Sequence, residues 1–192
     1  MQSGAPLVCL ASLSPRRQEL LTQIGVTHVV SAADIDEAVH PGEAPADYVV
    51  RVACAKARAV RARGTQLPVL AADTTVVIDG LILAKPRDRT EGIAMLARLS
   101  GRTHQVLTAV ALASATGVAF RLSASEVRLR ELTSEECAAY WATGEPRDKA
   151  GGYAIQGRGA LFIEHLSGSY SGVVGLPLYE TGQLLAAAGI RL

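Results

Sequence analysis

Apolar runs alternate with polar segments along the chain, and their periodicity divides it into strands and helices. Short apolar runs bounded by turn residues predict strands at 7–11, 28–31, 69–78, 81–83, 105–114, 118–130 and 161–165. Helical spacing with start and stop signals predicts helices at 15–24, 45–63, 90–99, 133–142 and 177–188. We expect Ser14 and Thr90 to cap two of these helices, and Thr133 with Glu136 to form a capping box.

The order of these elements predicts the fold class. Strands and helices alternate early in the chain, and two long strands follow each other in its middle. This order is typical of an α/β domain built around an elongated mixed β-sheet flanked by helices. The 192 residues contain no internal repeat, low-complexity tract or linker. We therefore expect one domain that spans residues 1–192.

Charge and composition exclude several classes of partner. The chain has 19 Lys and Arg residues against 18 Asp and Glu residues, and 4% of its residues are aromatic. A nucleic-acid-binding domain normally has a strong basic excess and aromatic rings that stack on bases, so no nucleic-acid partner is expected. The longest apolar stretch, 106–120, is interrupted by polar residues and is too short to cross a bilayer, so we expect no membrane partner.

The cysteines and the N-terminal segment indicate a cytoplasmic protein. Cys9, Cys54 and Cys137 are odd in number, far apart and in apolar contexts, so we expect buried, reduced thiols. Such thiols are typical of a reducing compartment. The segment 1–13 has no basic residue before its apolar run, which is unlike a signal peptide.

The sequence lacks several common catalytic motifs. It contains no GxxxxGK[ST], no GxGxxG after its first strand, no GxSxG and no HExxH. P-loop, dinucleotide-binding, serine-hydrolase and zinc-protease functions are therefore disfavoured. Of the 19 basic residues only three are lysines, Lys56, Lys85 and Lys149, which indicates places where a compact ammonium is needed.

Two polar clusters interrupt the apolar pattern in the first half of the chain. The segment 12–17, Ser-Leu-Ser-Pro-Arg-Arg, combines hydroxyls, helix N-terminal N–H groups and two guanidiniums, a suitable cradle for phosphate. A plain capped helix with two surface arginines is equally compatible with it. Asp73 and Thr74 lie inside an apolar run, where a carboxylate is costly to bury unless it is paired or bound to a metal. Local hydroxyls could also satisfy Asp73.

Two further clusters follow. Lys85 comes just after the predicted hairpin and can reach back over the sheet toward Asp73, although an ordinary loop lysine fits the same pattern. The segment 148–157 is rich in glycine, which lets the backbone approach a ligand closely, and its Gln156 carries an amide that can read a base edge. The alternative is a structural turn.

Together, these motifs resemble the Maf nucleotide pyrophosphatases, a family with an inosine-triphosphatase-like fold. The resemblance extends from Leu10 to Leu185 with the motifs in family order. Its motifs are Leu10-Ala11-Ser12-x-Ser14-Pro15-Arg16-Arg17, Ala72-Asp73-Thr74, Lys85-Pro86, Asp148-Lys149-Ala150-Gly151-x-Tyr153-x-Ile155-Gln156-Gly157 and Val174-Gly175-Leu176-Pro177-Leu178. The fourth motif is similar to the branch that acts on dTTP and UTP, and the branch acting on 7-methyl-GTP differs there. One departure is Leu13, where many relatives have glycine.

The resemblance implies hydrolysis of a nucleoside triphosphate between its α and β phosphates, giving a monophosphate and pyrophosphate. It implies that Asp73 is the catalytic proton acceptor and that a divalent cation (Mg²⁺, Mn²⁺ or Co²⁺) is held by Glu37 and Asp73. The substrate-binding positions it implies are, for the base, Arg16, Thr74 and Gln156, and, for the phosphates, Ser12, Arg17, Lys56 and Lys85. It also implies a homodimer.

Alternatives remain open from the residues alone. One alternative is a house-cleaning pyrophosphatase that hydrolyses ITP by the same chemistry. The other, from a different functional class, is a non-enzymatic interaction protein in cell division and septum formation. Buried charged clusters disfavour the latter, because they are costly in a pure binding module. Among pyrimidine substrates, dTTP, UTP and modified nucleotides are not separated.

Overall fold

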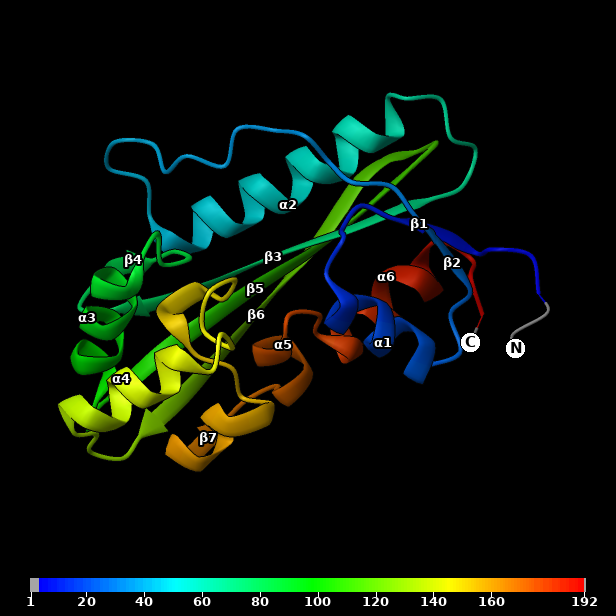
Figure 1. Cartoon of the computed structure of the whole chain (residues 1–192). Coiled ribbons are helices and arrows are strands. Elements are labelled where there is room, and N and C mark those ends of the chain that lie inside the picture. Colours follow the sequence, from blue (N-terminus) through cyan, green and yellow to red (C-terminus); the bar gives the residue numbers. More distant parts are fainter. Residues whose placement is uncertain (1–3, 192) are drawn as a thin grey trace.

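The computed structural model describes residues 4–191, which form seven strands and six α-helices in one mixed sheet with helices on both sides (Figure 1). The strand order is β2-β1-β3-β5-β6-β7, with β4 paired to β3. Only the β1 pairings are parallel. The strands are β1 (Val8–Leu10), β2 (His28–Val30), β3 (Val69–Ile78), β4 (Leu81–Leu83), β5 (Thr103–Ser114), β6 (Gly117–Leu129) and β7 (Ile163–Ser167). The predicted elongated mixed sheet is confirmed.

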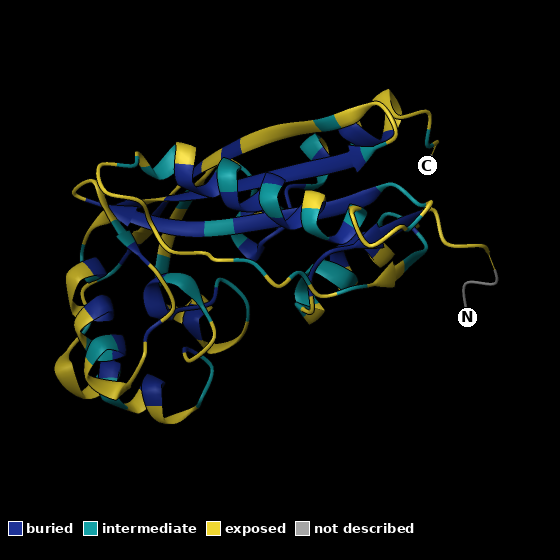
Figure 2. Ribbon diagram, turned by 90° about the horizontal axis from the view of Figure 1, so that it is seen from above, coloured by how far each residue is buried: buried dark blue, intermediate teal, exposed yellow. Residues whose placement is uncertain are grey.

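The helices cover both faces of the sheet and bury its central strands, which Figure 2 shows as buried ribbon. They are α1 (Pro15–Gln23), α2 (Pro45–Arg61), α3 (Arg89–Leu99), α4 (Ser134–Ala142), α5 (Tyr170–Val174) and α6 (Leu178–Ala187). Helix α2 packs on one face of β3 and β5, where Val52 meets Ala71 and Ala109 in one apolar cluster. Helices α1 and α6 pack on the opposite face, around Leu70 and Ala72.

The edge of β3 has a gap that exposes the middle of the strand. On that edge β3 pairs with β1 only through Val69 and Leu70, and with β4 only from Val76 onward. Between these pairings residues 71–75 have a strand neighbour on the β5 side alone. Because side chains alternate along a strand, Asp73 points to the α2 face and Thr74 to the opposite face. The gap therefore gives both side chains access to one space beside the sheet.

Most predicted elements are confirmed within a few residues, and some details of the predictions were wrong. Asp88, not Thr90, caps α3, because its carboxylate accepts the Glu91 N–H. Ser14 occupies the N-cap of α1 but makes no side-chain cap bond, and its N–H donates instead to Ser12 Oγ. The last strand begins at Ile163, because a short 3₁₀ segment, Gly157–Phe162, precedes it.

Other expectations about local structure are confirmed. Thr133 and Glu136 form the predicted capping box at the start of α4. All three cysteines are buried and free of disulfides. Among the described residues, no helix is long and apolar enough to cross a membrane.

Candidate active site

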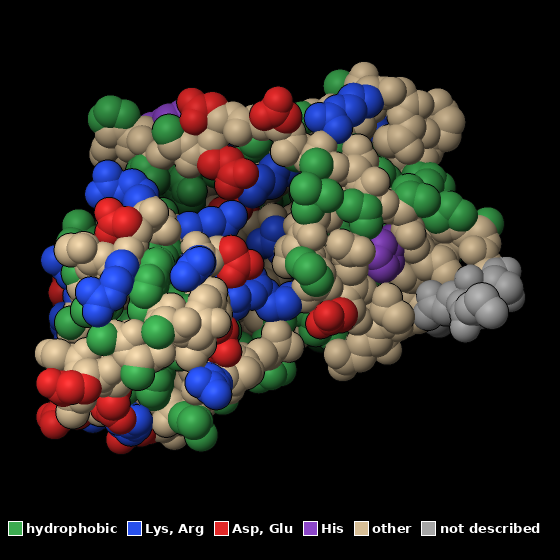
Figure 3. Space-filling view, viewed as in Figure 1, with side chains coloured by type: hydrophobic (Ala, Val, Ile, Leu, Met, Phe, Trp, Pro, Cys, Tyr) green, Lys and Arg blue, Asp and Glu red, His purple; other side chains and the backbone are tan. Residues whose placement is uncertain are grey.

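A cavity of about 660 Å³ opens at the gap in the sheet. Figure 3 shows it as a hollow in the middle of the molecule, with basic and acidic side chains gathered around it. Its volume is typical of a small-molecule site. All residues predicted for the site line it: Ser12, Arg16, Arg17, Glu37, Lys56, Asp73, Thr74, Lys85 and Gln156. The structure thus brings together residues from distant parts of the chain, while their individual roles stay predictions.

An ammonium joins the two predicted metal-binding carboxylates. Lys56, on α2, places its Nζ 2.8 Å from Asp73 Oδ1 and 2.9 Å from Glu37 Oε2. The Lys56 and Asp73 side chains are 11% and 9% exposed, whereas that of Glu37 is 46% exposed. The expectation that Asp73 must be paired is met by this lysine, since a buried carboxylate needs a compensating charge.

The loop that carries Glu37 is fastened to α2. The Tyr48 hydroxyl donates to the Glu37 carbonyl oxygen at 3.2 Å. Arg51 reaches the next carbonyl, that of Ala38, at 2.8 Å and also pairs with Glu43. Burial raises the pKa of Tyr48 to about 12, so its phenol remains protonated and able to donate. These contacts position the Glu37 carboxylate over Lys56.

Arg17 offers a positive charge that has no carboxylate partner within ion-pair distance among the described residues. Its Nε donates to the Gly175 carbonyl at 2.8 Å, Nη1 to Ser12 Oγ at 3.2 Å and Nη2 to Thr74 Oγ1 at 3.3 Å. Burial lowers the pKa of Arg17, and nearby Asp73 opposes that shift. Neutral acceptors thus fix the guanidinium and leave its charge available to an anion in the cavity.

The glycine-rich segment 148–157 forms another wall of the cavity. Gly151 has φ = +71° and donates its N–H to the Ala84 carbonyl at 3.2 Å, beside Lys85. A Cβ at Gly151 would come within 2.9 Å of the Val76 side chain, so glycine is required by both conformation and space. Across the cavity, Arg16 Nη2 lies 3.9 Å from Asp148 Oδ2.

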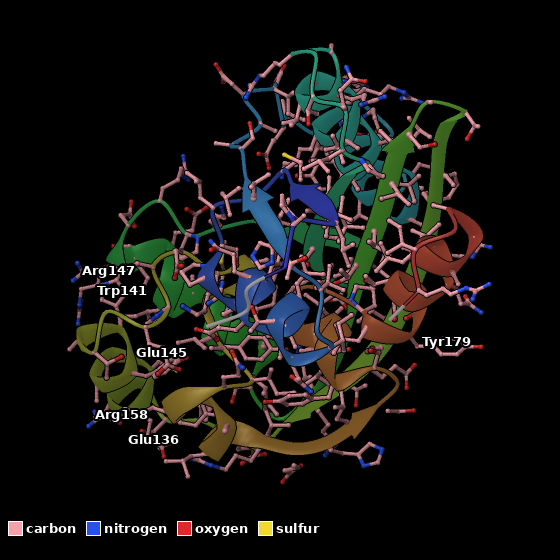
Figure 4. All side chains as sticks on the ribbon, turned by 90° about the vertical axis from the view of Figure 1, so that its right-hand side faces the viewer. Glu136, Trp141, Glu145, Arg147, Arg158 and Tyr179 are labelled. Atoms are coloured by element: carbon pink, nitrogen blue, oxygen red, sulfur yellow. The ribbon has the colours of Figure 1, made fainter. Side chains whose placement is uncertain are left out.

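Glu145 anchors the two ends of this wall. Its carboxylate accepts the Tyr140 hydroxyl at 2.6 Å and the N–H groups of Arg158 and Gly159 at 3.0 Å each. Its carbonyl oxygen accepts Lys149 Nζ at 2.7 Å. Figure 4 shows Glu145 and Arg158 near each other beyond the end of α4. The segment that carries Gln156 is therefore held from behind, and the Gln156 side chain is left to line the cavity.

A buried histidine supports the same wall. His104, on β5, is 2% exposed and its Nε2 lies 2.7 Å from the Tyr153 hydroxyl, while its Nδ1 has no partner in the described part of the chain. Burial lowers the pKa of His104 to about 4. The imidazole is therefore neutral in the folded protein at pH 7.

The buried His104 predicts an acid-sensitive fold. A histidine whose folded-state pKa is depressed favours the folded state above its unfolded pKa of about 6.5 and opposes it as the pH falls toward 4. We expect the free energy of unfolding to drop between these pH values, with His104 contributing about 3 kcal/mol of that drop. Urea denaturation at several pH values measures it. His104→Gln should make the free energy of unfolding less dependent on pH, whereas the same change at exposed His165 should not. An equal pH dependence for His104→Gln and wild type would contradict this assignment.

Glu37 and Asp73 have the donor chemistry that a divalent cation requires. Magnesium prefers one or two carboxylates together with substrate phosphates and water, and both carboxylates here converge on one point in the cavity. Among residues 4–191, no group of three or more His, Cys, Asp or Glu side chains is placed to hold a metal ion. Two carboxylates would supply only part of a cation's coordination, with substrate oxygens and water supplying the rest, and in this structure the positive charge between them is the Lys56 ammonium.

Some cavity residues were missed by the sequence analysis. Tyr48, Thr75 and Tyr153 also line the cavity, and Thr108 contacts Thr74 from β5. Tyr153 lies within the fourth of the quoted motifs, and period-two alternation, which places Thr75 on the same face of the strand as Asp73, is the signal that could have found Thr75. Thr108 carried no local signal, because it meets Thr74 only through the antiparallel register of β3 and β5.

Comparison with known proteins shows close relatives over most of the chain. A protein named dTTP/UTP pyrophosphatase from Methylobacillus flagellatus is 54% identical over 187 residues, which cover 96% of this chain and 94% of that protein. One with the same name from Saccharophagus degradans is 54% identical over 182 residues, covering 93% and 87%.

Solved structures offer a more distant likeness. The Ham1 protein of Staphylococcus aureus, at 11% identity and a TM-score of 0.44, covers 64% of this chain and 71% of its own. A HAM1 protein from Coxiella burnetii, at 20% identity and the same TM-score, covers 65% of this chain and 73% of its own.

The model of the family described as Maf-like protein matches residues 7–188. A match of that length, together with relatives that share more than half of their aligned residues, places this chain in the Maf-like protein family.

Proposed function

We propose that this protein is a nucleoside triphosphate pyrophosphatase that hydrolyses dTTP and UTP between the α and β phosphates, releasing a monophosphate and pyrophosphate. The observation that carries the proposal is the buried Asp73 carboxylate in a cavity otherwise rich in cations. The names of relatives at 54% identity support the same substrates.

Asp73 is the proton acceptor in this proposal. Hydrolysis needs a water aligned for attack on phosphorus and a group that takes its proton as the bond forms. Asp73 lies at the open edge of β3, where a water can reach it from the cavity. Lys56 holds one of its oxygens at 2.8 Å, which fixes the carboxylate and leaves the other oxygen for the water.

Cationic side chains neutralise the charge of the triphosphate, and a hydroxyl group donates a hydrogen bond to it. Arg17 presents free N–H groups after its three contacts with neutral acceptors, and Lys85 extends from the loop after β4 into the same cavity. Ser12 Oγ accepts from both Ser14 N–H and Arg17 Nη1, so its own proton is free to donate to a phosphate oxygen. Charge spread over the phosphate oxygens in the transition state is stabilised by such preset donors.

A divalent cation (Mg²⁺, Mn²⁺ or Co²⁺) held by Glu37 and Asp73 would add positive charge at the phosphate oxygens when bound. Base recognition is assigned to Thr74, Gln156 and Arg16. The Gln156 amide has both a donor and an acceptor, and its wall is fastened by Glu145 and Gly151.

Product analysis tests the proposal directly. The purified protein is incubated with Mg²⁺ and, separately, with dTTP, UTP, CTP, ITP or 7-methyl-GTP, and products are separated by chromatography. We expect pyrophosphate with TMP or UMP, and slow turnover of the other nucleotides. Release of orthophosphate would mean attack at the γ phosphate and would overturn the mechanism, and faster turnover of ITP would favour the ITP-type alternative. No turnover of any nucleotide would favour the interaction protein.

A further inference from the structure

We infer that Glu145 is a positioning residue that holds the Gln156 amide in place and through it sets how strongly the cavity discriminates between bases. The inference rests on the proposed function, because it adds a second determinant to the base recognition assigned to Gln156. Glu145 lies outside the lining of the cavity, so it acts on a nucleotide only through the segment that it holds.

The backbone on both sides of the base-reading amide is clamped by one pair of side chains. On the N-terminal side, the Ala154 N–H donates to the Tyr140 hydroxyl at 3.1 Å. On the C-terminal side, the Arg158 N–H donates to Glu145 Oε2 and the Gly159 N–H to Glu145 Oε1, at 3.0 Å each. The Tyr140 hydroxyl donates in turn to Glu145 Oε1 at 2.6 Å, which joins the two clamps into one unit.

The Glu145 carboxylate also lies directly against the residue that follows Gln156. Gly157 has φ = +71°, and a Cβ at this position would come within 2.5 Å of Glu145 Oε2. The close approach leaves the carboxylate little room to move relative to the backbone. Gln156 is partly buried and lines the cavity, so the backbone that Glu145 holds directs its amide.

Only a group with two acceptor oxygens satisfies all of these contacts. Burial opposes the ionisation of Glu145, but the hydrogen bonds from the phenol and the two backbone N–H groups outweigh it and lower the pKa of the carboxyl. In Glu145→Gln one oxygen becomes an NH₂ group, which only donates. Whichever way that amide turns, its NH₂ group faces the N–H of either Arg158 or Gly159, so one backbone donor loses its acceptor.

Two nucleotides and a double-mutant cycle test the inference. We measure kcat/KM for UTP and for CTP with wild type, Glu145→Gln, Gln156→Ala and the double variant. We expect Glu145→Gln to lower the UTP-to-CTP ratio of kcat/KM about tenfold, because a displaced amide discriminates less between bases. The double variant should lower the ratio no further than Gln156→Ala alone, since Glu145 acts through Gln156.

Glu136 provides the control, because it is a second carboxylate near α4 with different partners. It accepts hydrogen bonds from Arg130 and Thr133, so Glu136→Gln should keep the wild-type ratio. A merely structural role of Glu145 would lower the turnover of UTP and CTP alike. A folded Glu145→Gln protein with an unchanged ratio would therefore overturn the inference, as would losses that multiply in the double variant.

A second variant and wild type itself keep the inference testable. If Glu145→Gln does not fold, Tyr140→Phe decides, because it removes the acceptor of the Ala154 N–H and keeps the ring that packs against Phe162. A lower ratio would support the inference and an unchanged ratio would overturn it. Equal turnover of UTP and CTP by wild type would also overturn it, while the proposed cleavage between the α and β phosphates would stand. Absence of UTP turnover by wild type would overturn the proposed function and the inference with it.

Discussion

Asp73→Asn is expected to keep the fold and to lower kcat for UTP hydrolysis by about 10²–10⁴-fold, the usual contribution of a general base. The asparagine amide oxygen can still accept from Lys56 Nζ, which now lies 2.8 Å from Asp73 Oδ1. The amide cannot take a proton from water at neutral pH. Steady-state release of pyrophosphate measures the loss, and a thermal unfolding curve of the same sample reports the fold.

A matched carboxylate outside the cavity provides the control for this change. Asp79 lies at the turn between β3 and β4 and pairs with Arg102 on the surface. Asp79→Asn removes one carboxylate from the same hairpin and should leave kcat unchanged. An Asp73→Asn protein with wild-type turnover would remove Asp73 from the role of proton acceptor.

The helices and long strands could be predicted from sequence because their signals are local. The ten-residue apolar run of β3 and the Asp79-Gly80 turn define a hairpin regardless of the rest of the fold. Helix α5, Tyr170–Val174, was missed because five residues are too few for helical periodicity to stand out. Thr90 was predicted as the cap and Asp88 was missed, although Asp88 stands three residues before Glu91, a spacing typical of an N-terminus.

The composition of the site was predictable, but its geometry was not. Conspicuous residue types pointed to Asp73 in an apolar run and to lysines in an arginine-rich chain. The position of Asp73 at a gap in the sheet edge depends on β1 and β4 each pairing with only one end of β3, which is a matter of tertiary register. Lys56 was expected to contact phosphate, and that its Nζ joins Asp73 to Glu37 depends on how α2 lies across the sheet.

That contact makes Lys56→Met the substitution with the largest expected effect on stability. Methionine keeps much of the volume of the lysine stem but leaves Asp73, with a side chain 9% exposed, without its cation. Breaking a buried ion pair by removing one partner typically costs about 3–5 kcal/mol. We expect about 3 kcal/mol, because the open cavity lets water reach the carboxylate. Urea denaturation at pH 7 measures the change in the free energy of unfolding.

The double variant and a second lysine distinguish a charge effect from a packing effect. Lys56→Met combined with Asp73→Asn removes both the cation and the charge that it compensates, so the loss of stability should be clearly smaller than the sum of the two single losses. Lys85 lines the same cavity but is exposed, so Lys85→Met should lower the free energy of unfolding by less than about 1 kcal/mol. Additive losses, or equal losses for the two lysine variants, would mean that Lys56 contributes through packing alone. A coupled loss would show that α2 supplies the charge that allows a carboxylate to lie inside the sheet.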